Sequence, residues 1–127
     1  MNQIDDAAEE LIQRARRGDR EALGELLEQH RAYLRAMAEK RISGKLATRI
    51  DASDVIQQTC LSVYGNFEKF QGDREVEFLA WLQKIHEQNI HNVIRDHAHA
   101  QKRAVSREQS FDAEHDAPAN IPQADQT

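Results

Sequence analysis

The stretch DASDVIQQTCLSVYGNFEKFQG at 51–72 and the segment EFLAWLQKIHEQNIHNVIRDH at 77–97 decide the fold of this chain. In the first, Asp51 precedes apolar residues at helical spacing, which predicts a capped helix with one buried stripe. That stripe comprises Val55, Ile56, Thr59, Cys60, Val63, Tyr64 and Phe67. The second repeats the helical pattern from about Val76, then becomes polar and basic, and we expect its helix to continue to about Arg103.

Two further helices are predicted upstream of these. Asp5 or Asp6 can cap a first helix that runs to about Arg17, and Gly18 suits the end of this helix because glycine readily adopts the left-handed conformation. Asp19 then caps a second helix that we expect to run without a break to about Ile42. Its inward residues would be Ala22, Leu23, Leu26, Leu27, Tyr33, Leu34, Met37 and Ala38. The segment 43–50 is predicted to be a loop.

The composition supports an all-α fold. The chain has 127 residues, 6% aromatic residues and two prolines, which does not suggest a sandwich or barrel. We therefore expect a compact bundle of about four helices over residues 1–107. Residues 108–127 show no helical or strand periodicity of apolar residues and have a surplus of acidic residues, which predicts a disordered tail or linker.

The targeting and redox signals are weak. The acidic N-terminus has no apolar run, and no stretch approaches the ~20 apolar residues of a membrane span, so we expect no signal peptide and no membrane association. The single cysteine, Cys60, excludes an internal disulfide. A buried apolar position is favoured for it over a redox-sensing one, and a reducing cytoplasm fits.

Basic residues are concentrated in two segments although the net charge is −5. Residues 31–49 carry six basic side chains and one acidic one, and residues 93–107 carry four and one. Local patches decide where a polyanion can bind, so nucleic acid remains a candidate partner. Ordinary solvated helix faces are the alternative.

The sequence offers no site for covalent chemistry. His86 and His91 are five residues apart, whereas two zinc ligands on one helix face need a spacing of four. With one cysteine and no glycine-rich phosphate loop or nucleophile elbow, we expect no metal, no cofactor and no enzyme. The six histidines are expected to be solvated.

The predicted loop between the last two helices suggests a reader of single-stranded nucleic acid, which needs stacking surfaces and a positive track. Phe70 in this loop could belong to the core or stack on a base, whereas Phe78 and Trp81 fit the core better. Amide side chains can read base edges. They form part of the polar row Gln88, Asn89, Asn92 and Arg95 on the last helix.

The order of these motifs resembles region 2 of bacterial sigma factors of the sigma-70 family, extracytoplasmic-function (ECF) group. The resemblance covers about 11–107 and includes the break at Gly18. It also includes a helix that begins at Asp51, the run from Phe67 to Gly72, and Phe78-Leu-Ala-Trp81-Leu82.

The resemblance implies a role in transcription initiation, with core RNA polymerase and promoter DNA as partners. It implies that the helix after Asp51 binds the clamp helices of the polymerase β′ subunit through Asp54, Gln57, Gln58, Thr59 and Leu61. It also implies that the minus-ten element is melted and held as non-template single strand. The DNA-binding residues would be Lys69, Phe70, Gln71, Gly72, Gln88, Asn89, Asn92, Arg95, Lys102 and Arg103. An anti-sigma factor is a further partner that the resemblance allows.

Such proteins carry a second helical domain, region 4, and nothing after Arg107 is expected to form it. We expect an excised region 2, with a natural single-domain variant as the alternative. The rival function is a helical protein-interaction module without DNA binding, which the net acidity favours. The basic run after Val93 and the Phe70 loop favour the sigma interpretation.

Overall fold

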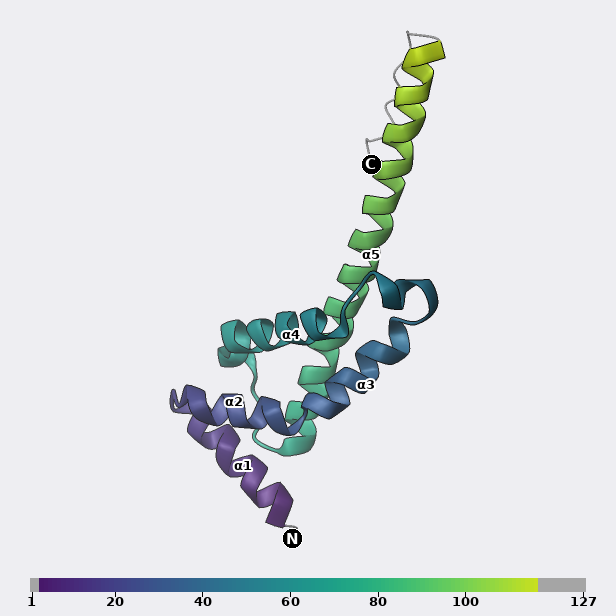
Figure 1. Ribbon diagram of the computed structural model, residues 1–127. Helices are drawn as coiled ribbons and strands as arrows, with labels where there is room; N and C mark the ends of the chain where they lie inside the picture. Colours follow the sequence, from purple (N-terminus) through teal and green to yellow (C-terminus); the bar gives the residue numbers. More distant parts are fainter. Residues whose placement is uncertain (1–2, 117–127) are drawn as a thin grey trace. The chain divides into compact units, whose positions relative to one another are not determined.

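The computed structural model describes the backbone of residues 3–116 and the side chains of residues 7–108. Within this part all regular structure is helical, so the all-α prediction is confirmed (Figure 1). The helices are α1 (Gln3–Arg16), α2 (Arg20–Gln29), α3 (Arg31–Arg41), η1 (Gly44–Thr48), α4 (Ala52–Asn66), η2 (Phe67–Lys69) and α5 (Glu75–Asp116). The chain divides into two compact units, one ending at His91 and the other beginning at Asn92. Each unit is described by itself.

The turn between α1 and α2 follows from two residues. Gly18 adopts φ 101°, its N–H donates to the Ala15 carbonyl at 3.0 Å, and the Asp19 N–H donates to the Arg14 carbonyl at 3.0 Å. This is the Schellman pattern that a left-handed glycine permits. The Asp19 carboxylate caps α2 by accepting the Ala22 N–H at 3.2 Å. A hydrogen bond from the Arg14 guanidinium, with that backbone donor, lowers the pKa of Asp19. Both the helix end and the cap were predicted correctly.

The predicted helix from Asp19 to Ile42 is broken at His30 into α2 and α3. His30 Nδ1 donates to the Leu26 carbonyl at 2.9 Å, and its backbone N–H bonds to the Leu27 carbonyl instead at 3.0 Å. The side chain thus takes the carbonyl that an unbroken helix would use for the backbone. His30 is buried, which corrects the expectation of a solvated histidine. Tyr33 follows the break and is 38% exposed rather than inward.

The junction between α3 and α4 is a short 3-10 helix, η1, where a loop was predicted. Ile42 and Ile50 on either side of η1 are buried, so both ends of this connection are held by apolar packing. Asp51 then caps α4 as predicted, because its carboxylate accepts the Ser53 N–H at 2.9 Å.

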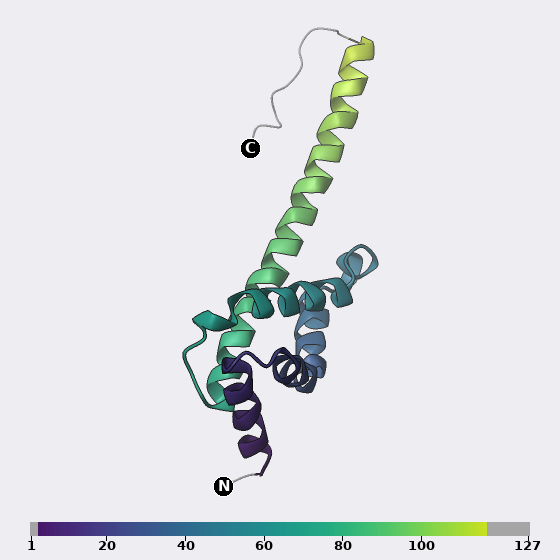
Figure 2. The same cartoon turned by 90° about the vertical axis from the view of Figure 1, so that its left-hand side faces the viewer.

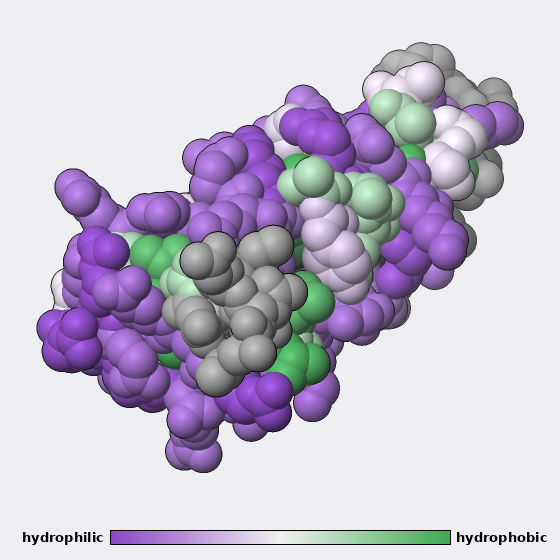
Figure 3. All heavy atoms as spheres, turned by 90° about the horizontal axis from the view of Figure 1, so that it is seen from below, coloured by the Kyte–Doolittle hydropathy of each residue, from purple (hydrophilic) through white to green (hydrophobic). Residues whose placement is uncertain are grey.

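The core of the first unit is built from buried residues of α1, α2, α3, α4, η2 and the beginning of α5. The two ribbon views show how these elements are arranged (Figures 1 and 2). Four aromatic rings, Phe67, Phe70, Phe78 and Trp81, lie with centroids 5.2–6.5 Å apart where η2 meets α5. Such tilted and edge-on pairs add to the gain from apolar burial. Hydrophilic residues dominate the face shown in Figure 3, and apolar ones form small separate patches there.

The last helix extends further than predicted. α5 runs to Asp116, past both Arg103 and the expected start of the tail at residue 108. The rest of the predicted tail, residues 117–127, lies outside the described residues. Within the second unit none of residues 92–108 is buried. This long solvated helix carries no core of its own over those residues.

Candidate nucleic-acid interface

The loop between η2 and α5 is held from two sides. Arg16 of α1 donates to the Phe70 carbonyl at 3.0 Å and also to the Gly72 carbonyl. At the start of α5, Glu77 Oε1 accepts the N–H groups of Asp73 and Arg74 at 2.9 and 3.1 Å. These backbone donors lower the pKa of Glu77. The loop is therefore shaped before any ligand binds.

Two of the predicted DNA-binding loop residues have structural roles. Phe70 is 4% exposed and packs in the aromatic cluster, so the structure supports the core interpretation left open by the sequence. A Cβ at Gly72 would lie 2.7–2.8 Å from Glu77 and the Phe70 ring, so only glycine fits without rearrangement. Lys69 and Gln71 are exposed and are the loop residues of the predicted set whose side chains a ligand can reach.

A surface hollow of about 460 Å³ lies between α4, η2 and α5. It is lined by Ser62, Asn66, Lys69, Trp81, Lys84, Ile85, Gln88 and Asn89, and we call it the α4–α5 hollow. It combines a half-buried indole, two lysines and three side-chain amides. A ring face, positive charge and amide groups are the elements that single-strand readers use.

A buried hydrogen-bond chain lies behind this hollow. His86 is fully buried, with Nε2 2.8 Å from the Leu34 carbonyl and Nδ1 2.6 Å from Thr59 Oγ1. The expectation of a solvated histidine is therefore wrong for His86. Burial lowers its pKa, although the Leu34 hydrogen bond and Glu87 act in the opposite direction. These hydrogen bonds connect α3, α4 and α5 through the His86 imidazole.

Asn89 joins this chain to the hollow. Its Nδ2 donates to Thr59 Oγ1 at 3.2 Å and to Ser62 Oγ at 3.3 Å. Asn89 is only partly buried. A predicted base-reading residue is thus anchored to α4 through its amide nitrogen, a contact that the sequence pattern did not show.

The predicted polymerase-binding residues of α4 fall on two sides. Asp54, Gln57, Gln58 and Leu61 are exposed and recur at spacings of three and four, so they share one outer face. Leu61 is 58% exposed, which is unusual for an apolar side chain of its size. Thr59 is fully buried and turned toward His86, so it supports the helix from within.

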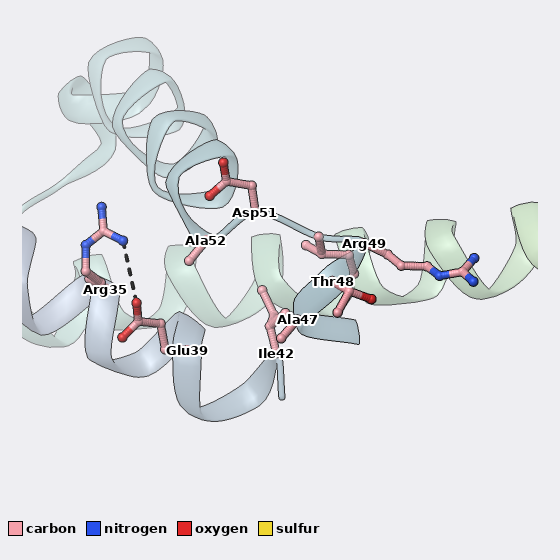
Figure 4. Close-up of a pocket in the computed structure, with 9 residues that line it drawn as sticks. Arg35, Glu39, Ile42, Ala47, Thr48, Arg49, Asp51 and Ala52 are labelled. Atoms are coloured by element: carbon pink, nitrogen blue, oxygen red, sulfur yellow. Dashed lines mark ion pairs between the residues drawn. The ribbon is translucent and has the colours of Figure 1, made fainter. Parts of the chain in front are cut away.

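A second hollow lies between α3, η1 and the start of α4 (Figure 4). Arg35 pairs with Glu39 at 3.5 Å and donates to Ser53 Oγ at 3.2 Å, which ties α3 to the first turn of α4. The Arg49 guanidinium points away from this hollow (Figure 4). These contacts hold in place the helix that carries Asp54.

The remaining predicted DNA-binding residues, Asn92, Arg95, Lys102 and Arg103, belong to the second unit. Arg95 pairs with Asp96 at 3.6 Å, whereas Lys102 and Arg103 are exposed. Arg95 and Lys102 are seven residues apart and Arg103 follows, so the three lie on one side of the helix in this unit.

Several residues that line the α4–α5 hollow were not predicted from the sequence as site residues. These are Ser62, Asn66, Lys84 and Ile85, together with Trp81, which was assigned to the core. The signal was present for α5, because Trp81, Lys84 and Gln88 are three and four residues apart and therefore share a face. Ser62 and Asn66 gave no such signal, since their approach to α5 depends on how the helices pack.

Neither a metal site nor a membrane span is found in the part of the chain that the structure describes. No group of three histidine, cysteine or acidic residues there could hold a metal ion. None of the described helices has the length and apolar content needed to cross a bilayer.

The family model for sigma-70 region 2 matches residues 26–103, which is more than half of the chain. The chain belongs to this family. It therefore has a role in transcription initiation, through binding of RNA polymerase and melting of promoter DNA, and region 2 is not an enzyme. This favours the sigma interpretation over a protein-interaction module without DNA. No curated protein and no solved structure matches the chain.

Proposed function

We propose that this chain is region 2 of a bacterial sigma factor of the ECF group and acts in the cytoplasm. The outer face of α4 binds the clamp helices of the polymerase β′ subunit. The α4–α5 hollow and the loop at 69–74 receive the non-template strand of the minus-ten element. The observation that carries the DNA part is the meeting of Trp81, two lysines and three amides in one hollow.

In the proposed function, basic side chains attract the phosphates of the strand and the Trp81 ring stacks on a base. Lys69 and Lys84 line the hollow and would attract phosphates, while the half-buried Trp81 ring offers a stacking surface. Stacking and polar contacts with an extruded base must offset an unpairing cost of a few kcal/mol. Lys102 and Arg103 on the second unit would contribute further attraction that does not depend on sequence.

The polymerase assignment rests on the exposed face of α4. Leu61 supplies an apolar contact at the C-terminal end of this face, and Asp54, Gln57 and Gln58 supply polar ones. Asp54 lies in the first turn of α4, where an acidic side chain also favours the helix dipole. The same face would be available to an anti-sigma factor.

Charge reversal at Asp54 tests this assignment. We expect Asp54→Arg to weaken binding to core RNA polymerase by at least about tenfold, since reversing a charge in a packed interface creates repulsion. Circular dichroism should show unchanged helicity. The matched control is Glu21→Arg, which makes the same charge change in the first turn of α2. Equal affinity of the Asp54→Arg variant and the parent in a pull-down titration would contradict the polymerase assignment.

A further inference from the structure

Asn89 is held in one orientation by groups that lie behind the α4–α5 hollow. Three assignments, made one after another, fix this orientation: which nitrogen of His86 carries the hydrogen, where the Thr59 hydroxyl donates, and where the Ser62 hydroxyl donates. Each can be settled from which atoms are able to donate.

His86 donates from Nε2 and accepts at Nδ1. The Leu34 carbonyl can only accept, so the Nε2 that lies 2.8 Å away carries the hydrogen. A neutral imidazole has one N–H, so Nδ1 is an acceptor. The hydrogen bond of 2.6 Å between Nδ1 and Thr59 therefore uses the single hydroxyl hydrogen of Thr59.

The two hydroxyl oxygens that bond to Asn89 act as acceptors. The Thr59 hydroxyl donates its hydrogen to His86 Nδ1, and the Ser62 hydroxyl donates its hydrogen to the Gln58 carbonyl at 3.0 Å. Both oxygens can therefore only accept from Asn89. Its Nδ2 supplies one hydrogen to each, at 3.2 and 3.3 Å. A flipped amide would place Oδ1 against two acceptors, so this flip is excluded.

The Asn89 side chain offers a hydrogen-bond acceptor to a ligand in the hollow. With both hydrogens of Nδ2 committed to α4, the remaining polar atom of the Asn89 side chain is Oδ1, an acceptor. The neighbouring Asn66 also donates from Nδ2 to a backbone carbonyl, that of Ser62, at 2.8 Å. Lys69 and Lys84 line the same hollow, and their ammonium groups can donate hydrogen bonds to phosphate oxygens.

We infer that the α4–α5 hollow selects an unpaired adenine or cytosine through its exocyclic amino group, that Asn89 Oδ1 is the specificity-determining acceptor, and that Thr59 and His86 are its positioning residues. Adenine N6 and cytosine N4 are donors, whereas thymine presents the O4 acceptor at the equivalent place. The inference rests on the proposed binding of single-stranded DNA and adds the class of base and the residues that select it.

The test uses the full chain assembled with core RNA polymerase, and fluorescence anisotropy with labelled oligothymidylate strands. The strands carry a single central adenine, cytosine, thymine or unsubstituted purine, which is adenine without its amino group. We expect adenine and cytosine strands to bind about five- to tenfold more tightly than the purine and thymine strands, as for one gained hydrogen bond. Asn89→Leu should equalise the binding of the adenine and purine strands.

The positioning role has its own pair of variants. Thr59→Val removes the hydroxyl and should reduce the preference for adenine over purine, whereas Thr59→Ser keeps the hydroxyl and should preserve it. Thr48→Val on η1 is the matched control and should leave the preference unchanged, because the Thr48 hydroxyl donates to the nearby Lys45 carbonyl and Thr48 does not line the hollow. Thermal melting confirms that each variant is folded, and if Thr59→Val does not fold, Asn89→Leu decides.

The outcomes separate this inference from the proposed function. Equal binding of all four strands by the parent holoenzyme would overturn the inference and leave single-strand binding intact. A preference that survives Asn89→Leu would also overturn it. Failure of a properly assembled holoenzyme to bind any strand would overturn both.

Discussion

At the scale of single residues, His86 shows how a polar side chain can occupy a core position. Phe78, Leu82, His86 and Ile90 recur every four residues and are all fully buried. The spacing was visible in the sequence, yet a solvated ring was expected for His86. The ring can be buried because the Leu34 carbonyl and the Thr59 hydroxyl satisfy both of its nitrogens, and these contacts depend on the fold.

The lowered pKa of His86 makes a prediction about stability and pH. The folded state favours the neutral ring, so an unfolded chain takes up the proton first as the pH falls. Stability should be fully present above the ordinary histidine pKa of about 6.5 and should decline as the pH falls below it. We expect a decline in the free energy of unfolding between pH 7.5 and pH 5 that His86→Gln does not show.

The measurement is urea unfolding across this pH range for the parent, His86→Gln and the control His91→Gln. His91 is exposed, so its variant should follow the parent. A pH profile of the His86→Gln variant that matches the parent would exclude His86 as the source of the decline.

At the scale of elements, local signals predicted the helix ends well. Gly18, Asp19 and Asp51 act within a few residues of themselves, so their capping roles could be derived without the fold. The break at His30 could not, because a histidine is compatible with a continuous helix. What decides the break is the bond from its ring to the Leu26 carbonyl, together with burial against the Phe78 ring at 5.7 Å.

The loop between η2 and α5 makes a prediction at this scale. Arg16 is the long-range contact that holds it, through two backbone carbonyls and a position 5.5 Å from the Phe70 ring centre. We expect Arg16→Ala to lower the free energy of unfolding by about 1 kcal/mol, the typical contribution of such hydrogen bonds. Amide hydrogen exchange at residues 70–74 should accelerate.

The control for this change is Arg17→Ala, the exposed arginine next along the chain. It should alter neither stability nor exchange in the loop. Unchanged exchange at residues 70–74 in the Arg16→Ala variant would mean that Glu77 alone shapes the loop.

At the scale of the whole molecule, the order of motifs predicted a sigma-70 region 2 and an all-α fold. The family match over 26–103 confirmed the sigma-70 region 2, and the helices of the described residues confirmed the fold class. The exposed face of α4 could also be predicted, since helical periodicity alone separates Asp54 and Leu61 from the buried side. The α4–α5 hollow could be predicted only in part. Lys69, Gln88 and Asn89 were selected from the sequence, but Ser62 and Asn66 meet them through packing between helices.

The charge distribution of the whole chain gives the last prediction. The net charge is −5, yet adjacent exposed Lys-Arg pairs occur at 40–41 in the first unit and at 102–103 in the second. If the second pair binds phosphates of the non-template strand, replacing Lys102 and Arg103 by alanine should weaken binding of every oligonucleotide alike. For single strands each neutralised phosphate contributes ~0.7 to the slope of log affinity against log salt, so the slope should flatten by about 1.4.

The same double replacement at Lys40 and Arg41 is a control matched in residue type, exposure and charge, and it should leave the slope unchanged. Anisotropy over a salt series with the assembled holoenzyme measures both. Equal slopes for the parent and the Lys102/Arg103 variant would remove the second unit from the proposed strand path, because a phosphate contact cannot be lost without changing the number of counterions released.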